Sequence, residues 1–176
     1  MAEQFTAEQI IELLNLKPHP TCGFVAESYR AQARISDEAL PAGYAGSRPF
    51  ASVLYFMVTS AARIRLHRIR SDQMYHHYLG APLEVLLLYP DGTGEIKILG
   101  RDLTGGMRPQ LLIPGGTFHS SRLHQGGAAA EFALLGTTEW PGFESPDLEL
   151  GEPTKLMAAY PSLRREIEAF MATFPP

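Results

Sequence analysis

The stretch Pro114-Gly115-Gly116-Thr117-Phe118-His119 places a turn directly before a strand that begins with a histidine. Proline and glycine are strong turn formers, and the residues that follow have the length and composition of a short strand. The same alternation of apolar runs and turn residues extends along most of the chain, without βαβ repeats, which predicts a β-sandwich or barrel. The predicted strands are 24–30, 51–59, 62–69, 73–79, 84–89, 94–99, 110–113, 119–123 and 132–138.

A helix is predicted at each end of the barrel. Thr6 is a suitable N-cap for a helix over 6–16, and the Pro18 that follows ends it. Near the C-terminus Leu163, Ile167 and Phe170 recur at helical spacing, which predicts a helix over about 161–173. We therefore expect one domain over residues 1–176, with the barrel over about 22–150.

Composition excludes several classes of protein. The chain has 176 residues, of which 45% are hydrophobic and 19% charged, and its net charge is −4 with scattered basic residues. These values are typical of a globular domain and give no electrostatic footprint for nucleic acid. The single Cys22 fits a reducing compartment, and no basic leader or membrane-length apolar run is evident. We expect a cytoplasmic protein with no membrane or nucleic-acid partner.

Four of the six histidines fall in two groups. His67, His76 and His77 flank a turn at 70–72, and His119 follows the Pro-Gly-Gly turn. A site in a barrel needs side chains from separate strands that converge inward.

The histidines at 76 and 77 compete for one inward position, because successive strand side chains point to opposite faces. If Gln73 faces inward, then Tyr75 and His77 do so as well, and His76 lies on the other face. Both arrangements stay open here.

The spacing Pro114-x-Gly116-x-x-His119 resembles the second conserved motif of the cupin superfamily. The first cupin motif is matched in part, since His67 and Gly80 are present. Arg65 stands where that motif has its first histidine, and Gln73 stands where it has its glutamate.

A broader resemblance to the fifth cupin family, a family described as a domain of unknown function, covers nearly the whole chain. The matching segments are 19–20, 23–24, 27–30, 53–56, 67–68, 71–76, 80–83, 109–110, 113–116, 141–143 and 147–150. The resemblance implies an all-β, RmlC-like jelly roll, that is, a double-stranded β-helix. It also implies an internal small-molecule pocket and a homodimer.

Two enzymatic hypotheses and one binding hypothesis follow. In an epimerase-like or isomerase-like enzyme acting on a small polar, for example sugar-derived, molecule, His67 or His119 removes a proton next to a carbonyl and Tyr75 or Tyr29 returns it. In a metal-dependent oxygenase or hydrolase, a divalent transition metal is held by His67, Gln73, His119 and His77 or His76. The third hypothesis is a non-catalytic small-molecule binder.

Further residues are candidates for ligand binding. Glu27 and Tyr29 line the barrel mouth or pack at a dimer edge, and Arg65 holds an anionic group or is solvated. Trp140 is a pocket lid or an anchor for a partner subunit. The ligand-binding set is Glu27, Tyr29, Arg65, Gln73, His76, His77, Gln110 and Trp140.

Overall fold

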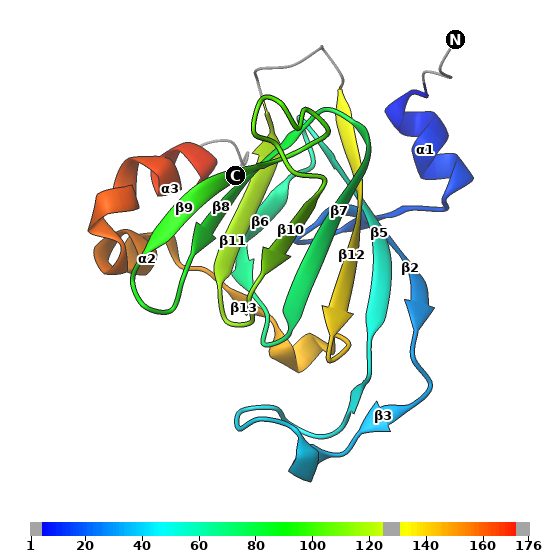
Figure 1. The fold of residues 1–176 in the computed structure, drawn as a ribbon, viewed down its shortest axis with the longest axis vertical. Helices are drawn as coiled ribbons and strands as arrows, with labels where there is room; N and C mark the ends of the chain where they lie inside the picture. Colours follow the sequence, from blue (N-terminus) through cyan, green and yellow to red (C-terminus); the bar gives the residue numbers. More distant parts are fainter. Residues whose placement is uncertain (1–4, 125–130, 172–176) are drawn as a thin grey trace.

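The computed structural model describes residues 5–124 and 131–171, which form two facing antiparallel sheets flanked by helices (Figure 1). The six-stranded sheet has the order β1 (Lys17–His19), β2 (Gly23–Arg30), β5 (Ser52–Thr59), β12 (Phe132–Trp140), β7 (Asp72–Gly80) and β10 (Gln110–Ile113). The five-stranded sheet has the order β13 (Glu149–Leu150), β6 (Ile64–Arg68), β11 (Phe118–Leu123), β8 (Leu83–Leu88) and β9 (Gly94–Leu99). The predicted jelly-roll barrel is confirmed.

All nine predicted strands are present, and their ends differ from the prediction by no more than two residues. Four strands were not predicted: β1, β3 (Arg34–Ile35), β4 (Arg48–Pro49) and β13. Each has two or three residues, which is too short for a visible alternation of apolar and polar side chains. The turn signal at 126–127 lies outside the described residues.

The helices at the two ends differ in how well they were predicted. Helix α1 (Ala7–Leu13) begins after the N-cap Thr6, whose hydroxyl accepts a hydrogen bond from the backbone N–H of Gln9 in a capping box. It ends at Leu13 and not at residue 16 as predicted, because the backbone leaves the helical conformation before Asn15, which has φ +52°. The C-terminal region has three pieces, α2 (Pro153–Ala159), the 3₁₀ turn η3 (Pro161–Leu163) and α3 (Arg164–Met171). Helix α2 was not predicted, and the last two residues of the predicted 161–173 helix lie outside the described part of the chain.

Three apolar clusters hold the layers together. The largest lies between the two sheets and includes Phe56, Ile64, Leu87 and Leu135. Helices α2 and α3 cover the outer face of the five-stranded sheet, and α1 covers part of the outer face of the six-stranded sheet (Figure 1). No helix in the described ranges has the length and apolar character needed to cross a membrane.

The Pro-Gly-Gly turn before β11 is bound to the turn between β6 and β7. The backbone N–H of Gly115 donates to the Asp72 carboxylate at 2.7 Å, and that of Gly116 donates to the Ile69 carbonyl at 2.8 Å. Gly116 has φ +79°, a conformation that glycine adopts without steric cost. These bonds place β11 beside β6 with His119 paired opposite His67.

Leu87→Ala tests the core between the sheets. Leu87 is fully buried, so removing three carbon atoms leaves a cavity, and we expect a loss of about 2–5 kcal/mol in the free energy of unfolding. Urea denaturation measures it. Leu103→Ala, at a side chain that is 60% exposed, is the matched control and is expected to change stability by less than about 0.5 kcal/mol. Equal losses in both variants would contradict the assigned core.

Candidate active site in the barrel

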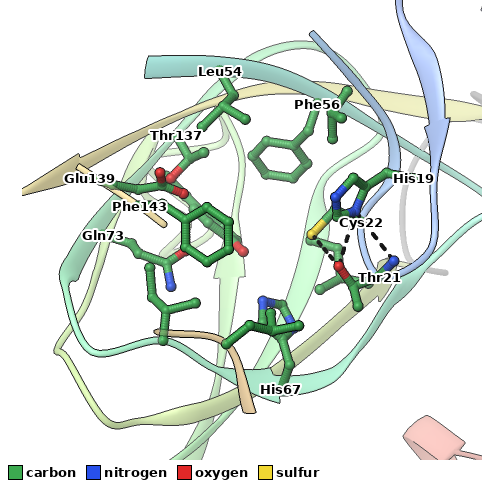
Figure 2. A pocket seen from close by; sticks show the side chains of 15 residues that line it. His19, Thr21, Cys22, Leu54, Phe56, His67, Gln73, Thr137, Glu139 and Phe143 are labelled. Atoms are coloured by element: carbon green, nitrogen blue, oxygen red, sulfur yellow. Dashed lines mark hydrogen bonds between the residues drawn. The ribbon is translucent and has the colours of Figure 1, made fainter. Parts of the chain in front are cut away.

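A cavity of about 70 Å³ lies between the two sheets at one end of the barrel (Figure 2). For scale, a cavity of about 10–15 Å³ on the same measure holds one water molecule, so this cavity suits a small molecule. Its apolar lining is Val25, Leu54, Phe56, Ile64, Ile69, Phe143 and Leu148. Its polar lining is His19, Thr21, Cys22, His67, Gln73, Tyr75, Thr137 and Glu139.

Glu139 brings a carboxyl group into this largely apolar space from the end of β12. The Ser52 hydroxyl donates to its Oε2 at 2.6 Å, and the backbone N–H of Phe143 donates to the Ser52 hydroxyl at 3.0 Å. Burial disfavours the charged form and raises the pKa of Glu139 to about 7. This carboxyl group can therefore take up or release a proton near neutral pH.

His67 faces the same cavity from β6. Its Nδ1 donates to the carbonyl of Arg65 at 2.7 Å, which assigns the proton to Nδ1 and leaves Nε2 as a hydrogen-bond acceptor. Removal from water lowers the pKa of His67 to about 4. The ring is therefore neutral at pH 7, and within the described chain Nε2 has no hydrogen-bond partner.

His119 lies next to His67, with ring centroids 4.3 Å apart, but does not line the cavity. The Tyr75 hydroxyl lies 3.0 Å from its Nε2, and its Nδ1 lies 3.3 Å from the Thr117 carbonyl. Nδ1 is thus the donor, and Nε2 accepts the Tyr75 proton. Burial lowers the pKa of His119 well below its usual value and raises the pKa of Tyr75. Both ring nitrogens of His119 are therefore used in hydrogen bonds. The side chain positions Tyr75 and offers no free nitrogen to the cavity.

Two further polar side chains point at the cavity without partners. The hydroxyl of Thr137 is buried and forms no hydrogen bond with the described residues, and the amide of Gln73 forms none either. Buried polar groups in native proteins are nearly always satisfied, by protein, water or a ligand. Figure 2 shows Thr137, Gln73 and Glu139 on one side of the cavity, which gives that wall several donors and acceptors for a ligand.

The opposite side carries His19, Thr21 and Cys22 (Figure 2). The hydroxyl of Thr21 lies 3.0 Å from Nδ1 of His19 and 3.4 Å from the sulfur of Cys22. Burial raises the pKa of the Cys22 thiol to about 11, so it stays protonated at neutral pH. The sequence indicated no role for Cys22, yet its side chain forms part of the cavity wall.

Strand β7 places its side chains by strict alternation. Gln73, Tyr75 and His77 are buried on the inward face. His76 lies on the outward face, where its ring nitrogens contact the Gln110 amide and the Thr138 hydroxyl, each at 3.2 Å. His77 is inward but distant from the cavity lining, and its Nε2 donates to the Ala81 carbonyl at 2.8 Å.

The four residues predicted to hold a metal do not fit a metal site in this arrangement. His67 and Gln73 line the cavity, His119 uses both ring nitrogens for hydrogen bonds, and His77 lies elsewhere in the barrel. Over residues 5–124 and 131–171, no group of three or more His, Cys, Asp or Glu side chains is arranged to hold a metal ion.

The remaining predicted ligand-binding residues lie away from the cavity lining. Glu27 forms an ion pair with Arg30, and Arg65 is exposed. Tyr29 and Trp140 are exposed as well, at 57% and 38%. The structure thus brings His67, Gln73 and Tyr75 together at the cavity and does not bring these four residues to it.

Glu139 was missed from the sequence because the last predicted strand ended at 138, and Thr137 lies within that predicted strand but was not identified as a site residue. In the structure β12 continues to Trp140, and its inward positions are Ala133, Leu135, Thr137 and Glu139. A carboxylate that continues the inward alternation of an apolar strand is the signal that could have identified Glu139.

Known proteins resemble the chain over nearly its whole length. The family described as Cupin superfamily (DUF985) matches residues 8–151. A hypothetical protein from Leishmania major superposes with a TM-score of 0.84 at 26% identity and covers 94% of this chain and 98% of its own. A protein from Shewanella oneidensis has a TM-score of 0.80 at 29% identity and covers 98% and 99%. An uncharacterized protein of Saccharomyces cerevisiae is 24% identical over 145 residues, which are 80% of this chain and 72% of the yeast protein.

Glu139→Gln tests the buried carboxyl group. Its pKa of about 7 in the folded chain lies above the usual 4.5, so the folded protein holds an extra proton between these pH values. In this range the carboxyl group ionises in the unfolded chain but not in the folded one, so the free energy of unfolding decreases as pH rises from about 4.5 to 7, by up to about 3 kcal/mol. We expect Glu139→Gln to gain stability relative to the wild type over that range, as measured by urea denaturation at several pH values.

The lowered pKa of His67 acts equally in both proteins and cancels in this difference. Glu168→Gln, at an exposed position of α3, is the control and is expected to change stability by less than about 0.5 kcal/mol. A flat difference for Glu139→Gln would show that the carboxyl group titrates normally.

Proposed function

The chain belongs to the cupin superfamily (DUF985), and from this premise we propose that its barrel cavity binds a small, uncharged polar molecule with a carbonyl group and catalyses proton transfer at the adjacent carbon. Such an activity is that of an isomerase or epimerase, and a sugar-derived compound is a suitable substrate. The observation that carries the proposal is the buried Glu139 carboxyl group, whose pKa lies near 7, in one cavity with the unpartnered Nε2 of His67.

Glu139 is better suited than His67 to move the proton at carbon. A general base works best when its pKa lies near the operating pH, and the pKa values are about 7 for Glu139 and about 4 for His67. In its ionised form Glu139 takes the proton from the hydroxyl-bearing carbon next to the carbonyl and, once protonated, delivers it to the former carbonyl carbon, while the hydroxyl proton passes to the former carbonyl oxygen.

The other polar lining side chains stabilise and orient the reacting molecule. The Thr137 hydroxyl and the Gln73 amide are unpartnered donors that suit the oxygen on which negative charge develops. Nε2 of His67 accepts a hydrogen bond from a substrate hydroxyl. Tyr75 keeps its proton because burial raises its pKa. Its hydroxyl donates that proton in a hydrogen bond to His119, which fixes the position of the Tyr75 ring in the cavity wall.

The composition of the cavity wall favours a neutral ligand. Among the described residues no lysine or arginine side chain lines the cavity, and most of the lining surface is apolar. An anion in this space would lose hydration without meeting an opposite charge, which costs several kcal/mol. Arg65, which was predicted to hold an anionic group, does not line the cavity.

Solvent-deuterium incorporation into small hydroxyaldehydes and hydroxyketones, followed by NMR in D₂O, tests the activity. We expect Glu139→Gln to lower the exchange rate by about 10²–10⁴-fold, the usual worth of a general acid or base. The wild-type rate should rise with pH and level off above about 7, as Glu139 becomes ionised. Glu168→Gln on α3 is the matched control and is expected to keep the wild-type rate.

Other outcomes would favour the alternatives. Saturable binding of these compounds without exchange would make the protein a non-catalytic binder. A stoichiometric divalent transition metal in the purified protein, lost in His67→Ala, would favour the metal-dependent enzyme over the proposed reaction.

A further inference from the structure

A second hollow, of about 530 Å³, lies next to the cavity on the outside of the barrel. We call it the Arg70 groove. Its lining is Pro41, Ala42, Tyr44, Arg68, Ile69, Arg70, Gly115, Gly116, Pro146, Asp147, Leu148 and Glu149. Ile69 and Leu148 line both hollows, so the groove and the cavity share part of a wall.

Arg70 presents an unused guanidinium group to this groove. Its side chain is 49% exposed and forms no hydrogen bond with the residues that the structure describes. The carboxylate that approaches it is that of Asp147, with 3.9 Å between Arg70 Nε and Asp147 Oδ1. The planar fork of N–H donors is thus free to bind a ligand.

Asp147 does not neutralise Arg70, because it is already paired with Arg48. Arg48 Nε and Nη2 donate to the two carboxylate oxygens of Asp147, each at 2.7 Å, and both side chains are almost completely buried. Such a bidentate pair fixes both partners and satisfies the negative charge. It forms a rigid base beneath Arg70.

Arg68 is also held in place, with donors to spare. Its Nε and Nη2 donate to Oε2 of Glu149 at 2.9 and 2.7 Å, and its guanidinium lies 4.5 Å from the ring centroid of Phe118. Nη1 of Arg68 has no partner within the described ranges. Arg48 pairs with Asp147 and Arg68 pairs with Glu149, so among the described residues that line the groove Arg70 is the arginine without a hydrogen-bonded carboxylate.

We propose that the Arg70 groove is an oxyanion-binding site, which takes a phosphate group or a carboxylate. Arg70 binds two oxygens of the anion through its fork, since guanidinium matches phosphate and carboxylate geometry in a bidentate way. Nη1 of Arg68 supplies a further donor. Gly115 and Gly116, which have no side chains, also line the groove, and a Cβ on Gly115 would collide with the Arg70 carbonyl.

Isothermal titration with inorganic phosphate at low ionic strength tests the site, since salt screens exposed charges. We expect saturable binding to the wild type and an affinity about tenfold or more lower in Arg70→Gln, in line with the worth of a charge-assisted hydrogen bond. Arg70→Lys keeps the charge and loses the fork, so its affinity should fall in between. Arg165→Gln, at an exposed position of α3, is the matched control and should bind phosphate as the wild type does.

A parallel titration with acetate distinguishes the two sources of the oxyanion. Tighter binding of phosphate supports a phosphate ester as the natural ligand, and equal binding supports a carboxylate. Absence of saturable phosphate and acetate binding, or equal affinities in wild type and Arg70→Gln, would overturn the proposal. Circular dichroism shows whether each variant keeps its fold. Because neither ligand needs to react, the result does not depend on the proposed proton transfer.

Discussion

The two hydrogen bonds that tie the Pro-Gly-Gly turn to the β6–β7 turn are the constraint on which the rest of the site depends. Gly115 and Gly116 bind Asp72 and the Ile69 carbonyl, and so set where β11 begins. Because side chains alternate along a strand, a shift of one residue would turn every inward residue of β11 outward. The pairing of His119 with His67 across the sheet follows from this register.

The barrel interior changes in character along its length. Around Leu87 and Leu135 it is a dry apolar core, whereas near Glu139 it opens into a cavity with unpartnered polar groups. Keeping a carboxyl group there costs stability at neutral pH, as its raised pKa shows. The large apolar core can offset such a cost, and buried groups with strongly shifted pKa values are characteristic of functional sites.

The histidines divide into different structural roles once the barrel is closed. His67 presents Nε2, without a hydrogen-bond partner among the described residues, to the cavity. His119 lies outside the cavity lining and accepts a hydrogen bond from the Tyr75 hydroxyl. His76 faces outward, and His77 is satisfied in part by the Ala81 carbonyl. The expected convergence of two strand segments grouped them as metal ligands, but strand alternation and local hydrogen bonds point their nitrogens in different directions.

The sequence by itself determined an all-β sandwich or barrel, its nine main strands, the Thr6 cap and the shared face of Gln73, Tyr75 and His77, because turn residues and strand alternation are local properties. Only the tertiary structure decided that Glu139 and Thr137 complete the cavity with His67. These residues come from strands far apart in the chain, and burial, not residue type, sets their chemistry. The tertiary structure likewise showed that Asp147 pairs with Arg48 and leaves the guanidinium of Arg70 without a hydrogen bond to the described residues.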